Sequence, residues 1–170
     1  MQKLDAEKTN SILKKQLGKL GAAAGAAGGL TGGGLLSSVG GALGGYSGSR
    51  WMAGILRTIE YSESMELPCS PEQAIHSATA ILVGMRSFTQ WVEEEPQSSS
   101  PFLAALVGSG FCRMNPTVVC LEFATLDDGT TVVHMAAQAK EGLINQKSAQ
   151  KAVKNIRELL QVECCLAKSL

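Results

Sequence analysis

Residues 20–49 form a stretch of thirty residues without a charged side chain, bounded by Lys19 and Arg50. Glycine recurs there at every fourth position in two runs, at Gly21, Gly25, Gly29 and Gly33, and at Gly40, Gly44 and Gly48. Four residues are nearly one turn of an α-helix, so each run leaves a stripe that carries no side chains. The backbone of a second helix can lie unusually close to such a stripe. The sequence therefore predicts a glycine-rich helical segment over residues 20–50 that serves helix packing.

A helix of this composition needs support from outside itself, because each glycine costs about 1 kcal/mol relative to alanine. The sequence leaves three possibilities open. The helix is supported by a bilayer with helix partners, it is supported by a protein assembly, or it has no support and the segment is a flexible linker. Alanine and leucine at helical spacing argue against the linker, which would be richer in serine. One crossing takes roughly 20 residues, so the segment is long enough for one tilted transmembrane helix or a shallow hairpin.

Residues 1–19 are predicted to form a basic amphipathic helix that leads into the glycine segment. Its apolar residues follow helical spacing and its lysines lie on the other side. A short basic run before an uncharged segment suits an anionic membrane surface, although a solvated helix end fits equally well. The residues expected at such a surface are Lys14, Lys15, Lys19, Arg50 and Trp51.

The composition separates this N-terminal part from the rest of the chain. Fourteen of the nineteen glycines lie between Gly18 and Gly54, so residues 51–170 are expected to form a separate folded domain. The net charge of zero argues against nucleic-acid binding by charge neutralisation. Five cysteines without a CxxC spacing indicate a reducing, cytoplasmic compartment rather than a disulfide framework or a zinc site.

Residues 51–170 carry the pattern of an α+β domain. Alternating polar and apolar residues predict a strand over 58–67, and Ser70-Pro71-Glu72-Gln73 has the form of a helix-capping box, followed by a helix over about 71–85. Further strands are predicted near 88–93 and over 103–111, 117–125 and 130–139, and a long helix closes the chain. We therefore expect about five strands in a mainly antiparallel sheet.

The last two strands are predicted to have two apolar faces. A tight turn at Asp128-Gly129 would place Val119, Leu121 and Phe123 on one face. The other face would carry Val118, Cys120, Val133, Met135 and Ala137. A sheet with helices on one side is normally polar on the other, so the second face must meet a partner, a ligand or the glycine segment. A register slip would exchange the two sets and leave this conclusion unchanged.

The segments 65–74 and 149–160 resemble the first strand, the capped helix and the closing helix of the START or Bet v 1-like helix-grip family. The resemblance covers about residues 55–163, and this chain has fewer predicted strands than that family. Membership would imply binding of a lipid or another hydrophobic molecule. The N-terminal part is similar to glycine-zipper membrane segments, which implies closely packed helix oligomers.

Catalytic residues are few in this sequence. His76 and His134 have no carboxylate or metal-ligand partner at a suitable spacing, and Cys120 would lie on the opposite sheet face from His134. Cys69 could have a lowered pKa at a helix N-terminus, but a buried structural thiol is the ordinary interpretation. Residues 139–142 are interpreted as a strand end and a turn without chemistry. We expect no enzyme activity, no metal and no cofactor.

These observations favour a non-enzymatic, membrane-associated protein that self-assembles through its glycine helix. The α+β domain would then present an interaction surface on the cytoplasmic side, with membrane lipid and other copies of the chain as partners. The first alternative is a domain that binds a lipid or a small hydrophobic ligand. The second is a soluble homo-oligomeric structural assembly in which the glycine helices are buried between subunits.

Overall fold

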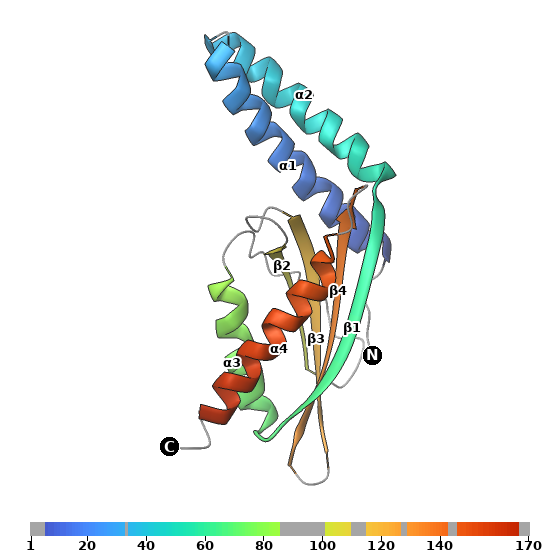
Figure 1. The fold of residues 1–170 in the computed structure, drawn as a ribbon, viewed down its shortest axis with the longest axis vertical. Coiled ribbons are helices and arrows are strands. Elements are labelled where there is room, and N and C mark those ends of the chain that lie inside the picture. The colour runs from blue at the N-terminus through green and yellow to red at the C-terminus, as the bar shows by residue number, and fades with distance from the viewer. Residues whose placement is uncertain are drawn as a thin grey trace.

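A computed structural model describes residues 6–32, 34–85, 101–109, 115–126, 129–142 and 146–166. A helical hairpin projects from one end of a four-stranded antiparallel sheet (Figure 1). In chain order the elements are α1 (Ala6–Gly32), α2 (Gly34–Ile55), β1 (Arg57–Leu67), α3 (Pro71–Gly84), β2 (Phe102–Ser109), β3 (Asn115–Thr125), β4 (Thr131–Glu141) and α4 (Ser148–Leu166).

The hairpin consists of two antiparallel helices that approach each other through glycine. A Cβ atom added at Gly25 would overlap the carbonyl oxygen of Gly41, and one added at Gly45 would overlap the carbonyl oxygen of Gly21. Near the tip, the Ser37 hydroxyl donates a hydrogen bond to the carbonyl of Gly29 at 2.8 Å. The backbones can come this close only because no side chain separates them.

The hairpin corrects the expected layout of the N-terminal part. The basic helix of residues 1–19 and the glycine segment of residues 20–50 were predicted as two units. In the structure α1 runs unbroken from Ala6 to Gly32 and joins most of the basic region to the first glycine run. The second run belongs to α2, which folds back on α1, so the partner of one glycine stripe lies in the same chain.

The strands of the sheet lie in the order β1-β4-β3-β2, with each neighbouring pair antiparallel. The α+β class is confirmed, and the structure shows four strands in the part of the chain that it describes. The fifth predicted strand, near 88–93, lies outside the described residues. The predicted helix start is confirmed, because Ser70 is the N-cap of α3 and its side chain accepts a hydrogen bond from the Gln73 amide at 3.4 Å.

The register of β3 and β4 differs by one residue from the expected one. Val119 lies opposite Ala137 and Leu121 lies opposite Met135. A shift of one residue exchanges the faces of one strand relative to the other, because side chains alternate along a strand. The set predicted as one face is therefore divided between the two faces.

The main core lies between the sheet and the helices α3 and α4, which cover the same face (Figure 1). Phe123, Leu121 and Met135 of the sheet are buried against Leu82 of α3 and Ile156 of α4. The opposite face carries a second, smaller cluster in which Leu13 of α1 is fully buried among Ala104, Leu106, Val118 and Cys120. This face was expected to meet a partner, a ligand or the glycine segment. The N-terminal half of α1, within the predicted basic helix, packs on it instead.

Glu141 at the end of β4 fixes the start of α4. Its carboxylate accepts hydrogen bonds from the Ser148 amide at 2.5 Å and from the Gln146 amide at 2.9 Å. Burial raises the pKa of Glu141, but the hydrogen bonds from Ser148, Gln146 and Lys147 outweigh burial and hold this pKa below its ordinary value. The ionised carboxylate therefore stabilises the first residues of α4 and those just before it.

We expect Gly25→Ala to destabilise the protein and Gly44→Ala to stabilise it. The first substitution separates the two helix backbones and should cost about 1–3 kcal/mol. At Gly44 an added Cβ meets nothing within 4 Å, so the intrinsic preference of helices for alanine should raise stability by about 1 kcal/mol. Thermal unfolding followed by circular dichroism checks both. An equal gain in the two variants would contradict the close helix contact.

Glu141→Gln should lower the free energy of unfolding by about 2 kcal/mol at neutral pH, since hydrogen bonds to a charged group are lost. Because the folded-state pKa of Glu141 is depressed, its contribution is present above the ordinary value of 4.5 and is lost as the pH falls through the folded-state pKa. The difference between the wild type and this variant should therefore shrink below about pH 4.5. Glu158→Gln, on the exposed side of α4, serves as the control. A difference that stays constant with pH would contradict this assignment.

Candidate functional site

The outward face of the hairpin carries the other half of the predicted glycine pattern. Gly40, Gly44 and Gly48 of α2 have open space where a Cβ would be, as does Gly28 of α1. Large apolar side chains lie on α2 as well, with Val39 58% exposed and Leu43 68% exposed. Gly33 lies outside the described residues. The hairpin is thus held together by one set of glycines and presents a second set to its surroundings.

The uncharged part of the hairpin is its projecting end. From Leu20 to Gly32, α1 extends about 20 Å at the rise of an α-helix, and α2 returns over a similar length to Ser49. Among the described residues, no helix combines the length and the hydrophobicity needed to cross a bilayer. The transmembrane helix considered from the sequence is therefore not supported.

The predicted membrane-surface residues lie at the base of the hairpin, where the antiparallel helices bring the two ends of the uncharged stretch together. Lys15 and Lys19 of α1 and Arg50 of α2 are exposed, and Trp51 is 68% exposed. Lys14 is partly buried, with its Nζ close to Gly54 of α2. We call Lys14, Lys15, Lys19 and Arg50 the basic collar.

The residues predicted to form one partner or ligand face lie on both faces of the sheet. Val133, Met135 and Ala137 belong to the main core beneath α3 and α4, while Val118 and Cys120 lie beneath α1. The one-residue difference in register explains this division. Only the second pair therefore remains at a candidate site.

A small cavity lies between α1 and this outer face of the sheet. Its volume is about 100 Å³, and Thr9, Val118, Cys120, Ala136 and Gln138 are among the residues that line it. Thr9 is 1% exposed, and its hydroxyl oxygen has no hydrogen-bond partner among the described residues. A buried hydroxyl without a partner costs about 1–3 kcal/mol, so the cavity is suited to a small occupant that can form one hydrogen bond.

Lys140 and its surroundings form a second candidate site at the base of the hairpin, at a position to which the sequence assigned no chemistry. Its Nζ donates to the Leu56 carbonyl at 3.3 Å and to the Thr58 hydroxyl at 3.4 Å. A cavity of about 340 Å³ opens beside Lys140 and is also lined by Leu17, Leu56 and Gln146. Burial, and then the charge of Lys14, lower the pKa of Lys140. A basic residue that is buried close to the collar is therefore part of this site.

Sequence reasoning missed Lys140 because four separate segments build its cavity. Leu17 comes from α1, Leu56 follows α2, and Asn115 begins β3. The only signal in the sequence was a lysine at the end of a strand whose other residues are mostly apolar.

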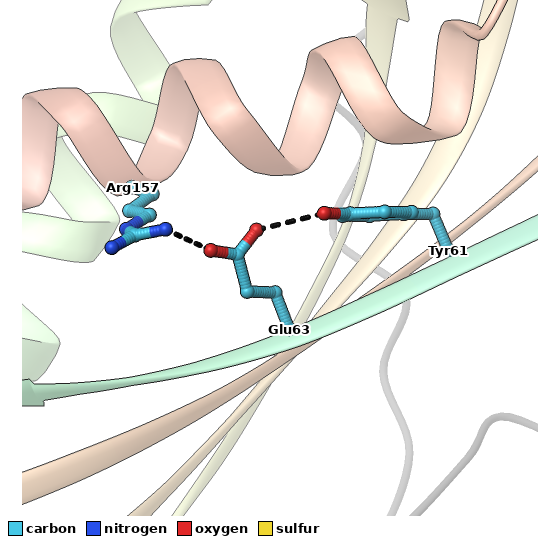
Figure 2. Close-up of polar contacts among 3 residues, drawn as sticks. All are labelled: Tyr61, Glu63 and Arg157. Carbon is cyan, nitrogen blue, oxygen red and sulfur yellow. Dashed lines mark hydrogen bonds and ion pairs between the residues drawn. The ribbon is translucent and has the colours of Figure 1, made fainter.

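Glu63 joins the edge strand β1 to α4. Figure 2 shows its carboxylate between two donors, with the Tyr61 hydroxyl at 3.0 Å from Oε2 and the Arg157 guanidinium paired with Oε1. Arg157 is 41% exposed on its side chain, so the ion pair is screened by solvent and contributes little stability. The cluster positions β1 under α4 and is not a candidate for chemistry.

The histidine environment differs from the expected one. Cys120 and His134 share the outer face of the sheet, because the register is shifted, but Cys120 lies opposite Ala136 and His134 lies opposite Glu122. The His134 Nδ1 is hydrogen-bonded to the Ser64 hydroxyl at 2.7 Å. Cys69 is buried at the start of α3, with its Sγ 3.3 Å from that of Cys164. Within the described ranges, no three histidine, cysteine, aspartate or glutamate side chains gather as metal ligands.

Comparison with known proteins gives no family for this chain. No family model matches it, and no curated protein matches it. Among solved structures, the Mll3558 protein from Rhizobium loti is similar with 11% identity and a TM-score of 0.40, over 64% of this chain and 98% of that one.

Two further solved structures are similar at the same level. Ara h 8.0201 has 9% identity and a TM-score of 0.39, over 67% of this chain and all of that one. The di-domain ARO/CYC StfQ from the steffimycin biosynthetic pathway has 9% identity and a TM-score of 0.33, over 79% of this chain and 60% of that one. TM-scores from 0.33 to 0.40 carry no argument about ligand or activity, and the helix-grip resemblance stays a prediction.

Proposed function

We propose that this protein is a non-enzymatic, lipid-binding protein that inserts the tip of its α1–α2 hairpin into one leaflet of a membrane. The observation that supports this proposal is the uncharged, outward-facing tip of the hairpin, with a basic collar at its base. The α+β domain stays at the membrane surface in a reducing compartment and presents its exposed faces to other partners.

The length of the tip suits one leaflet better than a full crossing. The hydrocarbon core of a bilayer is about 30 Å thick, so one leaflet is about 15 Å thick. The uncharged part extends about 20 Å in α1 and about 24 Å in α2, which reaches the core from the headgroup region without crossing it. Both segments are helical and satisfy most of their backbone hydrogen bonds internally, as hydrocarbon requires.

The base of the hairpin suits the headgroup region. Lys15, Lys19 and Arg50 are exposed there, and each such cation gains about 1 kcal/mol near an anionic leaflet. Trp51 is mostly exposed at the same level, and tryptophan favours the boundary between water and lipid. The collar therefore limits how deeply the tip can enter.

Self-assembly remains part of the proposal, but only one of the two predicted glycine stripes is open to a second copy of the chain. Gly21, Gly25 and Gly29 are occupied by contacts within the chain. The open stripe of Gly40, Gly44 and Gly48 is the surface on which a second hairpin could pack inside the leaflet.

A second candidate function is the binding of a small hydrophobic ligand in the cavity between α1 and the sheet. The Thr9 hydroxyl without a partner supports it, together with the apolar Val118 and Ala136 in the cavity wall. The volume of about 100 Å³ limits the ligand to a few heavy atoms unless α1 moves. Native mass spectrometry of the full chain should then show a bound small molecule that Ala136→Leu removes, whereas an empty wild type would argue against this function.

Val39→Asp should weaken binding to phosphatidylcholine vesicles by about 100-fold, since a charged side chain in the hydrocarbon costs about 3 kcal/mol. Val162→Asp on α4 is a matched control. Val162 is 57% exposed and Val39 is 58% exposed, but Val162 lies on α4 and not on the hairpin. Vesicle co-sedimentation of the full chain measures both. Equal binding by the two variants, or no binding by the wild type, would reject the insertion of the hairpin.

A further inference from the structure

The ammonium group of Lys140 is buried, and the described residues that it contacts are neutral. Lys140 is 4% exposed, and its Nζ contacts two neutral oxygens at 3.3 and 3.4 Å, both long distances for an ammonium hydrogen bond. Within the described part of the chain it forms no ion pair. Buried cations are normally paired, because removing an ammonium group from water is costly. The site is therefore electrostatically incomplete as it stands.

A second cation makes the site still more positive. Lys14 of α1 is close enough that its charge disfavours the protonated form of Lys140. Both residues belong to the same corner of the molecule, since Lys14 lies beside Gly54 and Lys140 contacts Leu56. An anion bound beside Lys140 would offset this repulsion and complete the solvation of its ammonium group.

The cavity beside Lys140 has room for such an anion. Its volume is about 340 Å³ and it is open to solvent, with Leu17 and Leu56 on the hairpin side and Asn115 and Gln146 on the other. Glu141 also lines it, and its ionised carboxylate is already held by backbone hydrogen bonds at the start of α4. Lys140 is the cation in the lining of this cavity. Lys14 lines a separate cavity with Glu7 and Arg50, and it adds its charge to Lys140 from nearby.

We propose that Lys140, with the charge of Lys14 nearby, binds a phosphate group in the cavity at the base of the hairpin, and that this phosphate belongs to the headgroup of an anionic lipid. The assignment to a headgroup rests on the proposed membrane function, because the cavity lies at the level of the basic collar when the tip is inserted. Binding of phosphate itself rests only on Lys140, the cavity beside it and the nearby charge of Lys14.

Lys140→Met tests the site against a purely structural role. Methionine keeps much of the length and apolar contact of lysine and removes a poorly solvated charge, so the melting temperature should stay equal or rise. Binding to phosphatidylcholine vesicles that contain phosphatidic acid should weaken about fivefold, the factor for one cation near an anionic surface. Lys154→Met, at an exposed position on α4, is the control and should bind as the wild type does.

An inorganic phosphate titration separates the phosphate site from the membrane. At constant ionic strength, phosphate but not chloride should shift the backbone amide NMR signals of Leu56 and Gly142, and Lys140→Met should abolish these shifts. The lack of such shifts, together with unchanged vesicle binding by Lys140→Met, would overturn the proposal. Shifts with unchanged vesicle binding by Lys140→Met would overturn the headgroup assignment and leave a soluble phosphate compound as the ligand. Shifts in a wild type that binds no vesicle would reject the membrane function and retain the phosphate site.

Discussion

The contact between the glycine backbones of α1 and α2 determines how the N-terminal part is built. Gly25 and Gly41 meet without side chains between them, so the two helices need few large residues to hold each other. Apolar residues that would ordinarily be buried between helices are left on the outside, as Val39 and Leu43 are. The same contact therefore stabilises the hairpin and gives it an apolar exterior at its projecting end.

The continuity of α1 connects this hairpin to the folded domain. Leu13 is fully buried against the outer face of the sheet, and Gly21 and Gly25 of the same helix pack against α2. A single helix thus covers the second apolar face and carries half of the projecting tip. No break in α1 separates the part that covers the sheet from the part that forms the hairpin.

Local signals in the sequence predicted the α+β class, the Ser70 cap and the two apolar faces of the sheet, because each depends on residues close together in the chain. The register was wrong by one residue, since alternation along a strand fixes its two faces but not how the turn pairs it with its neighbour. The sequence also did not decide which helix packs against Gly25, because the same glycine spacing suits contacts within a chain and between chains. The Lys140 cavity could not be foreseen, as it joins α1, the link after α2 and the ends of β3 and β4.

Two energetically unfavourable features lie at the same end of this molecule. Lys140 is a buried cation beside a second cation, and the hairpin tip exposes apolar side chains with the open glycines of α2. Neither feature stabilises the isolated chain. The Lys140 ammonium group forms no ion pair among the described residues, and the apolar side chains of the hairpin face water. In the proposed function, a phospholipid surface would supply partners for both, with anionic phosphate at the level of the base and hydrocarbon beyond it. Their arrangement along one axis is the strongest reason to regard hairpin and pocket as parts of a single lipid-binding surface.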